Sequence, residues 1–385
     1  MPDGSDGATV KVVSRIAEVP QAQWDACAGD DDPFVSHAFL SILEESGSAT
    51  AQTGWAPRHV VVEAAGGEVV ACAPLYLKSH SYGEYVFDWS WAQAYEQAGG
   101  RYYPKLQCAV PFTPVTGRRL LVRPAGAVAE RQDLLLAAML ELARRHEASS
   151  LHVTFPVEGE WRRLVERGLL SRLGQQYHWL NDGYGDFDDF LAALSSRKRK
   201  AIRKERERVA GSGLDIRTLT GDAVEPHHWD AFFGFYQHTG DRKWGRPYLT
   251  RDFFRLLGER LADRVVLVMA ERDGRPVAGA LNLRGRDVLY GRYWGAVEDH
   301  PFLHFECCYY RAIDFAIGHG LARVEAGAQG EHKASRGYLP VSTVSAHWIA
   351  DPALAGPVAR FLDHERAAVA EDIRRQTAEG PFRNG

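Results

Sequence analysis

Two segments of the 385-residue chain, 207 residues apart, share one pattern of apolar residues around a glycine-containing turn. Residues 60–75 read VVVEAAGGEVVACAPL, and residues 267–282 read LVMAERDGRPVAGALN. Apolar and β-branched runs on either side of a Gly-Gly or Asp-Gly pair predict a β-hairpin. Because the pattern occurs twice at this distance, the chain is expected to fold into two structural units of the same topology.

The segments around each hairpin extend this repeat. An amphipathic helix is predicted before each hairpin, at residues 37–47 and 249–261. After each hairpin we expect another strand and then a helix, which begins near Arg131 in the first half and near His304 in the second. Residues 322–328 are predicted to form a further strand. This order indicates an α/β (α+β) fold of two domains, each a mixed β-sheet flanked by helices.

The boundary between the two domains is expected near residues 178–190, which are rich in Gly, Asp and Asn. We place the domains at residues 1–185 and 186–385. The N-terminal sequence lacks a basic region followed by an apolar one, and no apolar run approaches the roughly 18 residues that cross a bilayer. The sequence therefore predicts a cytoplasmic protein without a membrane span.

The cysteine and glycine patterns exclude several classes of site. The five cysteines show no CxxC spacing, so neither a disulfide framework nor a zinc site is predicted, and no metal ligand is proposed. Cys307 and Cys308 lie in an apolar helical pattern and are expected to be buried. No GxSxG, Walker A, HExxH or GxGxxG motif occurs, which disfavours serine hydrolases, P-loop enzymes, zincins and dinucleotide enzymes.

A basic helix is predicted at the start of the second half. Eight of the twelve residues 197–208 are Lys or Arg, whereas the rest of the chain has 38 basic against 48 acidic residues. Like charges at i+4 repel one another, so an anion would stabilise this helix. It is interpreted either as a phosphate-binding surface or as a solvated charged face. A thin apolar seam is expected from Leu191, Leu194, Ile202 and Val209.

A polar, glycine-rich loop is predicted after the strand that ends near Glu325. At the end of a strand in an α/β protein, such a loop is typical of a ligand site, although a plain surface turn is the alternative. Its candidate general bases are Glu325, Glu331 and His332. Lys333 and Arg336 are candidates to bind an anion or a developing oxyanion.

Three other segments combine charge with aromatic residues. The first is a predicted loop at residues 238–250, which is interpreted either as a substrate-binding loop or as a loop that Trp244 anchors on the core. Its candidate substrate-binding residues are Asp241, Arg242, Lys243 and Trp244. The second is a predicted strand at 290–295, where Arg292 and Trp294 share one face. The third is residues 102–117, which contain three prolines and Lys105 and are predicted to be an ordered loop and an edge strand.

Taken together and in this order, these motifs resemble the FemAB-like branch of the GNAT acyltransferase superfamily, over roughly residues 30–365. The resemblance is carried by YYPKLQCAVPFTPVTG (102–117), SSRKRKAIRKERERV (195–209), TGDRKWGRPYLT (239–250), HFECCYYRAIDFAI (304–317) and EAGAQGEHKASRGYLPVSTVSAHWI (325–349). Proteins of this type are built from tandem GNAT-like domains. The resemblance therefore implies the same two-domain fold as the repeat.

The resemblance also implies an activity: transfer of an acyl or aminoacyl group onto an amine in a cleft between the domains, in peptidoglycan biosynthesis. It assigns Arg199, Arg203 and Lys204 to a nucleotide-linked substrate. Tyr338 and the preceding glycine match a family motif that has lysine where this chain has Ser335, so Lys333 or Arg336 would take the role of that lysine.

The resemblance implies aminoacyl-tRNA as the acyl donor, which would be a transient partner. Acetyl-CoA is the less favoured donor. The pyrophosphate-loop pattern of acetyl-CoA enzymes is matched only in part, by residues 123–128. No tightly bound cofactor and no particular oligomeric state are predicted. Two alternatives remain open at this stage: a catalytically inert double-GNAT scaffold that binds an anionic partner, and an acetyl-CoA-dependent N-acetyltransferase.

Overall fold

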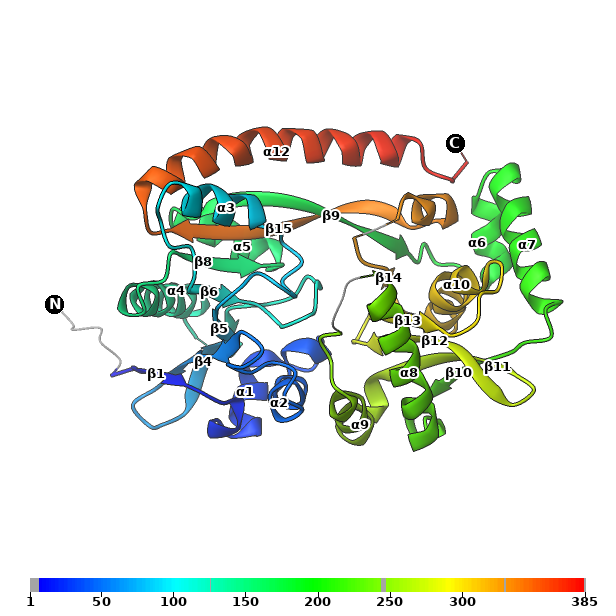
Figure 1. Ribbon diagram of the computed structural model, residues 1–385, viewed down its shortest axis with the longest axis horizontal. Coiled ribbons are helices and arrows are strands. Elements are labelled where there is room, and N and C mark those ends of the chain that lie inside the picture. The colour runs from blue at the N-terminus through cyan, green and yellow to red at the C-terminus, as the bar shows by residue number, and fades with distance from the viewer. Residues whose placement is uncertain (1–6, 125, 244–246, 329, 384–385) are drawn as a thin grey trace. The chain divides into compact units, whose positions relative to one another are not determined.

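The computed structural model describes residues 7–124, 126–243, 247–328 and 330–383 (Figure 1). They form two compact units, of which the first comprises Met1–Gly174 and Thr343–Ala370 and the second Gln175–Ser342 and Glu371–Gly385. The sequence analysis assigned everything after residue 185 to the second domain. In the structure, a single cut does not separate the units, because the chain returns to the first unit at Thr343.

The first unit contains two groups of strands. One has the order β1-β3-β4-β7, formed by β1 (Thr9–Val13), β3 (His59–Glu63), β4 (Val69–Ala73) and β7 (Leu121–Val122). The other has the order β2-β5-β6-β8 and continues to β15; it is formed by β2 (Trp55–Pro57), β5 (Leu75–Lys78), β6 (Lys105–Cys108), β8 (Ser150–Thr154) and β15 (Leu339–Ile349). Strands β6 and β8 pair in parallel, whereas β2-β5, β5-β6 and β8-β15 pair antiparallel, so the sheet is mixed.

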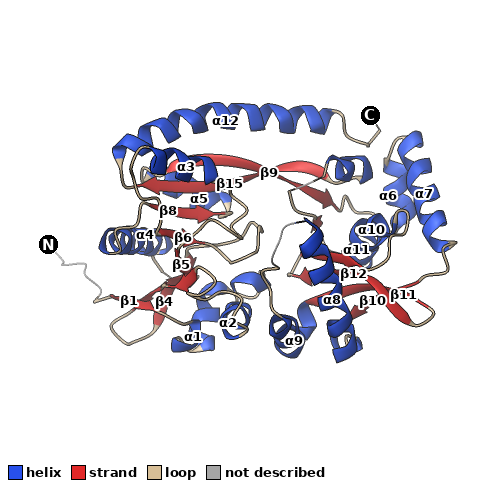
Figure 2. Ribbon diagram, viewed as in Figure 1, coloured by secondary structure: helices blue, strands red, loops and turns tan. Residues whose placement is uncertain are grey.

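Helices flank the strands of the first unit (Figure 2). They are α1 (Gln21–Ala28), α2 (His37–Glu45), α3 (Trp89–Gln97), α4 (Val128–Arg145), α5 (Glu158–Glu166) and the first part of α12 (Pro352–Ala378). Leucines and a methionine on one face of α4 are buried against the sheet, as shown by Leu135 and Met139 in one core with Val60 and Leu151. This packing follows from the apolar stripe that the sequence predicts for α4.

The second unit has one mixed group of strands, in the order β10-β11-β12-β13-β14-β9. Their bounds are β9 (Leu170–Leu180), β10 (Asp215–Thr220), β11 (Val265–Arg272), β12 (Arg275–Arg284), β13 (Val288–Ala296) and β14 (Arg323–Glu325). The helices are α6 (Phe187–Ala193), α7 (Ser196–Ala210), α8 (Pro226–Lys243), α9 (Arg251–Arg260), α10 (Leu303–Phe305) and α11 (Arg311–Gly318). A π-helical turn (Glu306–Tyr310) joins α10 to α11.

Short 3₁₀ turns complete the description of the chain. They lie at Ile16–Glu18, Pro33–Val35, Gly221–Ala223, Ala262–Arg264 and Glu331–Arg336. The last of these follows β14 and carries most of the candidate residues of the glycine-rich loop.

The internal repeat predicted from the sequence is confirmed. In each unit, a strand and two helices precede an antiparallel hairpin, and a pair of parallel strands connected through a helix follows it. The first unit has β2, β5, α3 and β7 in addition to these elements. The hairpins are β3-β4 and β11-β12, and the parallel pairs are β6-β8 and β13-β14. At the tight turn of the second hairpin, Asp273 and Gly274 both have positive φ, as a two-residue turn of this type requires.

Two local predictions were wrong. The apolar seam does not lie on one helix, because the chain is extended at Leu194 and Ser195, between α6 and α7. The C-terminal segment pairs with the chain at this break: Leu194 bridges to Phe382, and the Ser195 amide donates to the Pro381 carbonyl. The residues around Lys105 do not form an edge strand, because β6 lies between β5 and β8, and the prolines of this segment flank β6 without interrupting it.

Candidate functional site

The structure gathers most of the predicted site residues in the second unit, around the turn Glu331–Arg336 and helix α7. Lys105 belongs to the first unit and lies at the centre of a separate network of buried charges. The side chains of Asp241, Arg242 and Lys243 and all of Trp244 lie outside the described residues, as does the Glu331 side chain. The substrate-binding role of the first four residues and the general-base role of Glu331 stay predictions.

Lys333 is a buried cation in the turn Glu331–Arg336, which follows strand β14. Its side chain lies inside the turn that follows the strand, and Nζ donates to the carbonyls of Ala326 (2.5 Å) and Gly327 (3.3 Å). Within the described residues, no carboxylate lies within ion-pair distance of Nζ. Burial lowers the pKa of Lys333 to about 8, because there is little to offset the loss of water around the charge. An ammonium in this setting favours a nearby negative charge.

Arg336, from the same turn, is bound to the basic helix. Its guanidinium pairs with both carboxylate oxygens of Glu205 on α7, at 2.7 and 3.2 Å, and its Nε donates to the Tyr310 hydroxyl at 3.0 Å. It also lies 3.5 Å from the centre of the Phe305 ring. With its charge balanced by Glu205, Arg336 fixes the turn against α7, and fewer of its donors remain for an anion.

Aromatic side chains enclose this turn. Tyr338 is fully buried and donates its hydroxyl hydrogen bond to the Tyr309 carbonyl, at 3.1 Å, and burial raises its pKa. The exposed His332 lies with Nε2 3.0 Å from the Tyr309 hydroxyl. Of the titratable residues that the sequence singled out in this loop, His332 is therefore the one that combines exposure with a described hydrogen-bond partner.

Glu325 is buried where β14 ends. One carboxylate oxygen accepts a hydrogen bond from Arg323 Nε at 2.9 Å, and the other lies 3.7 Å from His178 Nε2. Burial lowers the pKa of His178 to about 3, with further lowering by the Arg323 and Lys333 charges, so the imidazole is neutral. This arrangement holds Glu325 as an ion-pair partner and shields it from solvent.

The basic segment is a helix, α7, as predicted, with Ile202 and Val209 buried. Arg203 and Lys204 are exposed and Arg199 is half-buried. Arg203 donates to Asp188 at 2.8 Å, but both side chains are more than half exposed. An exposed pair of this kind contributes little stability, so Arg203 remains available to a phosphate.

The sequence reasoning missed a second set of contacts on α7. Arg206, which is half-buried, donates to both oxygens of Glu306 at 3.1 and 3.2 Å and to Asp314 at 2.7 Å. Arg311 Nε donates to the same Glu306, at 2.9 Å. Arg206, Glu306 and Arg311 border an open cavity of about 530 Å³. Its lining consists of Phe187, Asp188, Leu191, Arg203, Arg206, Glu207, Val209, Ala210, Leu214, Ile216, Glu306 and Arg311.

Arg292, a candidate substrate-binding residue for which the sequence left a cleft-lining and a snorkelling position open, lies on β13 as expected from the strand pattern. Its side chain is half-buried, and the guanidinium carbon lies 5.3 Å from the centre of the Tyr293 ring. The contact is with its immediate neighbour in the chain. The proposed role of Arg292 in substrate binding stays a prediction.

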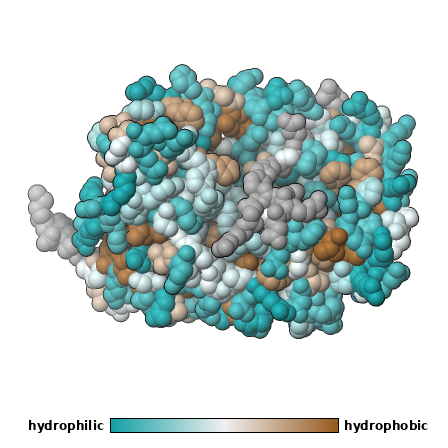
Figure 3. Space-filling view, in the orientation of Figure 1, coloured by the Kyte–Doolittle hydropathy of each residue, from teal (hydrophilic) through white to brown (hydrophobic). Residues whose placement is uncertain are grey.

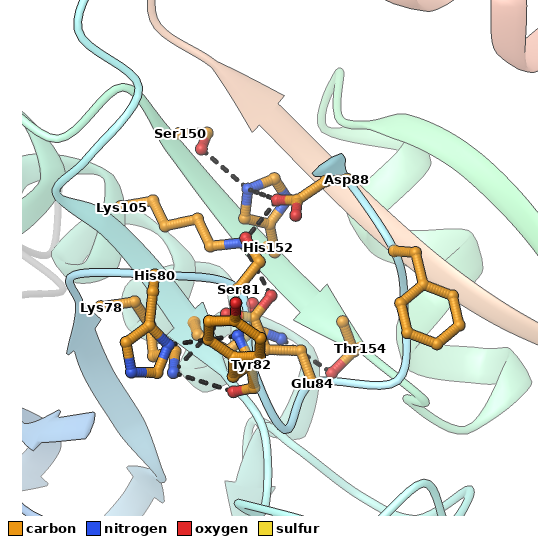
Figure 4. A network of polar contacts seen from close by, with 12 residues as sticks. Lys78, His80, Ser81, Tyr82, Glu84, Asp88, Lys105, Ser150, His152 and Thr154 are labelled. Carbon is orange, nitrogen blue, oxygen red and sulfur yellow. Dashed lines mark hydrogen bonds and ion pairs between the residues drawn. The ribbon is translucent and has the colours of Figure 1, made fainter. Parts of the chain in front are cut away.

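The first unit contains a buried charge network centred on Lys105 (Figure 4). Lys105 Nζ donates to Ser81 Oγ and Glu84 Oε2, both at 2.7 Å, and to Asp88 Oδ2. The other carboxylate oxygen of Glu84 lies 3.7 Å from Nζ of Lys78. All these side chains are buried, so the loop between β5 and α3, which supplies both acids and the serine, is fixed to the sheet.

The network shifts the titration of its members. Burial opposes ionisation of Asp88, but the Lys105 charge outweighs it and lowers the pKa of Asp88 well below its usual range. Burial lowers the pKa of Lys78 to about 7, against the attraction of Glu84. The Lys78 ammonium also lies 3.5 Å from the centre of the Trp55 ring and donates to the Tyr82 carbonyl at 3.3 Å.

Two buried histidines extend the network along β8 and β15. His152 and His347 face each other with their Nδ1 atoms 2.6 Å apart, and each Nε2 lies within hydrogen-bond distance of a serine hydroxyl. Burial lowers the pKa of His152 to about 3 and lowers that of His347 as well. Both rings are neutral, and one of them donates to the other.

The sequence analysis identified Lys105 but none of its partners. A signal was present in the aromatic- and acid-containing segment 79–89, SHSYGEYVFDW, which lies between two predicted elements. No group of three His, Cys, Asp or Glu side chains that could hold a metal occurs among the described residues. In the same part of the chain, no helix combines the length and apolar character of a membrane span. The face in Figure 3 is mostly hydrophilic, with hydrophobic residues in small groups.

Comparison with known proteins identifies the family. The chain belongs to the FemAB-like family, whose model, described as peptidoglycan biosynthesis/recognition, matches residues 15–384. No curated protein sequence matches the chain. Among solved structures, FemX is similar over 89% of this chain and 98% of its own, with 14% identity and a TM-score of 0.56.

Two other structures are similar in the same way. The C-terminal DUF2156 domain of a protein from Agrobacterium fabrum covers 90% of this chain and 96% of its own, at 11% identity and a TM-score of 0.55. A tandem GNAT protein from the clavulanic acid biosynthesis pathway covers 90% and 99%, at 14% identity and a TM-score of 0.49. Identities this low establish the fold alone. The fold is α/β, with mixed sheets flanked by helices in two units, as the sequence predicted.

Proposed function

We propose that this protein is an acyltransferase of the FemAB-like type, which moves an acyl or aminoacyl group onto an amine acceptor in peptidoglycan biosynthesis. The family and the fold support the reaction class, and the second unit supplies groups suited to it. In this reaction the acceptor nitrogen attacks the acyl carbon, the bond from that carbon to the donor oxygen or sulfur breaks, and the nitrogen loses a proton.

The observation that carries the proposal is the position of Lys333. Its ammonium is buried beside two backbone carbonyls, and the described residues provide no carboxylate for it. An ammonium has three N–H donors, so one remains for a ligand. Negative charge develops on the acyl oxygen as the acceptor nitrogen attacks, and a cation fixed in a site with little water stabilises that charge without reorganising.

The remaining roles follow from exposure and contacts. His332 is exposed and accepts the proton that the acceptor nitrogen loses, with Tyr309 holding the ring. Arg336 positions the turn through its ion pair with Glu205, and does not itself contact substrate. On α7, a phosphate of the donor or of a nucleotide-linked acceptor displaces Asp188 from Arg203.

A comparison of three variants with the wild type tests this assignment. We expect Lys333→Met to lower turnover on the order of 10²–10³-fold, which is typical for the loss of one oxyanion donor. Lys333→Arg is expected to retain part of the activity. Lys11→Met, which removes an exposed lysine of the first unit, serves as the control and is expected to match the wild type.

Turnover is measured by mass spectrometry of the acceptor, with aminoacyl-tRNA or acetyl-CoA as donor and a nucleotide-linked muropeptide as acceptor. If wild type and Lys333→Met transfer the acyl group at the same rate, the role of Lys333 is wrong. If the wild type binds tRNA and transfers nothing from either donor, the inert scaffold is the better account.

A further inference from the structure

Exposed aromatic residues are concentrated in one short segment of the first unit. Eleven large hydrophobic residues are exposed in the described part of the chain, and four of them lie within residues 82–89. These four are Tyr82 (56% exposed), Tyr85 (38%), Phe87 (56%) and Trp89 (40%). Exposed aromatic surface that gathers in this way marks an interaction site more often than single exposed residues do. We call residues 82–89 the aromatic loop.

The aromatic loop is held rigidly by the network described above. Glu84 and Asp88, which alternate with the exposed aromatic residues, point inward to Lys105, as Figure 4 shows. The Tyr82 carbonyl accepts from Lys78 at 3.3 Å, and the Phe87 carbonyl accepts from Arg172 at 2.7 Å. The buried charges therefore fix the backbone while the rings remain in solvent. A surface that is ordered before it binds loses less entropy on association.

The Tyr82 and Trp89 rings contact each other edge to face. The centres of the Tyr82 and Trp89 rings lie 4.8 Å apart, with 61° between their planes. Each of these side chains combines an apolar face with a polar group at its edge, the phenol hydroxyl or the indole N–H. A ligand that fits has an apolar face to stack on a ring and hydrogen-bonding groups around its rim. A pyranose ring has both, in the C–H groups of one face and the hydroxyl and amide groups at the edge.

The charges around the aromatic loop point to a neutral ligand. Residues 79–100 contain no Lys or Arg, and the acids Glu84 and Asp88 are buried and paired. Arg172, which contacts the Phe87 carbonyl, is paired with both carboxylate oxygens of Glu365. Nucleic-acid phosphates and anionic lipid surfaces are bound mainly through basic residues. This segment has no basic residue with which to bind either of them. An uncharged saccharide requires no counter-charge. The family description, peptidoglycan biosynthesis/recognition, refers to a polymer that contains saccharides.

We propose that the aromatic loop is a docking surface for the neutral hexosamine rings of a glycan, and that the exposed faces of Tyr82 and Trp89 are the ones on which the sugar rings stack. This surface lies in the first unit and takes no part in the acyl transfer assigned to Lys333. Binding of a glycan is therefore measured without any acyl donor, and its failure leaves the transferase proposal intact. Equally, an absence of acyl transfer leaves the docking surface to be judged by binding alone.

The probe for the experiment is chitotetraose, a neutral chain of four β-1,4-linked N-acetylglucosamine residues, titrated into the full chain by calorimetry. We expect the double variant Tyr82→Ala/Trp89→Ala to bind at least about tenfold more weakly than the wild type, because it loses two stacking rings. The double variant Tyr82→Phe/Trp89→Phe keeps the rings and is expected to stay within about threefold of the wild type. Phe361→Ala, which removes an exposed ring of α12, is the matched control and is expected to bind as the wild type does.

Thermal melting of each protein establishes that it is folded, which is expected because the substituted side chains are exposed and the Tyr82 carbonyl contact belongs to the backbone. Equal binding of chitotetraose by wild type and the double alanine variant overturns the proposal, as does a wild type that does not bind it. A parallel arm uses vesicles of phosphatidylcholine and phosphatidylglycerol. If the wild type binds these vesicles through Tyr82 and Trp89 but not the saccharide, the surface is a membrane contact and the proposal is wrong.

Discussion

Lys105→Met is expected to destabilise the first unit strongly. The Lys105 side chain is fully buried, and its partners Glu84 and Asp88 have side-chain exposures of 2% and 3%. Methionine fills a similar volume, so the main effect is to leave two buried carboxylates without their lysine. Lys78 remains 3.7 Å from Glu84, and Asp88 keeps the hydrogen bond from the Tyr102 hydroxyl. Removing one partner of a buried ion pair typically costs about 3–5 kcal/mol.

That loss converts into a large change in melting temperature. For a unit of this size, each kcal/mol shifts the midpoint by about 2–4 °C, so the expected decrease is roughly 6–20 °C. Urea unfolding followed by circular dichroism measures the same difference as free energy. Lys11→Met is the control, because Lys11 pairs with Glu63 on the surface, with exposures of 52% and 22%. Its loss is expected to stay below about 1 kcal/mol.

The effect of Lys105→Met also depends on pH in a defined direction. Without the lysine, the pKa of each buried carboxyl in the folded state rises above its value in the unfolded chain. The penalty is therefore fully present above the folded-state pKa and is relieved as the pH falls through it. We expect a smaller loss of stability at pH 5 than at pH 8, and partial recovery when Asp88→Asn is added. A loss in Lys105→Met no larger than in Lys11→Met, or independent of pH, would refute this reasoning.

Three further predictions concern other charges. Burial lowers the pKa of Lys78 to about 7 in the folded protein, so between pH 7 and about 10 the unfolded chain binds more protons than the folded one. The free energy of unfolding of the wild type, relative to that of Lys78→Met, should therefore rise with pH over that range, as measured by urea unfolding. Glu205→Gln leaves a buried guanidinium with a weaker partner and should cost about 1–3 kcal/mol, whereas a loss near zero would show that the turn is held by other contacts. For tRNA, log affinity should fall with log salt. A triple alanine variant at Arg199, Arg203 and Lys204 should reduce that slope by about 2–3 units, and an unchanged slope would make α7 a solvated surface.

The sequence was sufficient for features that depend on local patterns. The hairpin at Asp273 and Gly274 follows from turn residues that tolerate positive φ between two apolar runs. Helix α7 follows from its composition, and the position of Lys333 after a strand follows from the order of polar and apolar residues. The same local information shows that β14 ends in a loop whose composition suits a ligand-binding or catalytic site. It does not show which side chains contact one another there.

The contacts that decide the chemistry are long-range, and local patterns do not contain them. Arg336 meets Glu205 across 131 residues, which changes Arg336 from a free anion clamp to a residue bound to α7. Lys105 meets Asp88 because β5 and β6 pair and bring their flanking loop onto the sheet. At the break before Ser195, the chain pairs with the C-terminal segment near Pro381. In each case the pairing partner lies outside the window in which helical or strand periodicity acts.

The most direct test of acyl transfer is the mass of the acceptor after incubation with the wild-type protein and a labelled donor. The protein is mixed with aminoacyl-tRNA, or in a separate reaction with acetyl-CoA, and with a nucleotide-linked muropeptide that has a free amine. We predict that the acceptor gains the mass of one acyl group as an amide, and that Lys333→Met slows this gain on the order of 10²–10³-fold. An acceptor of unchanged mass with both donors, under conditions in which the protein is folded and binds tRNA, would contradict the account.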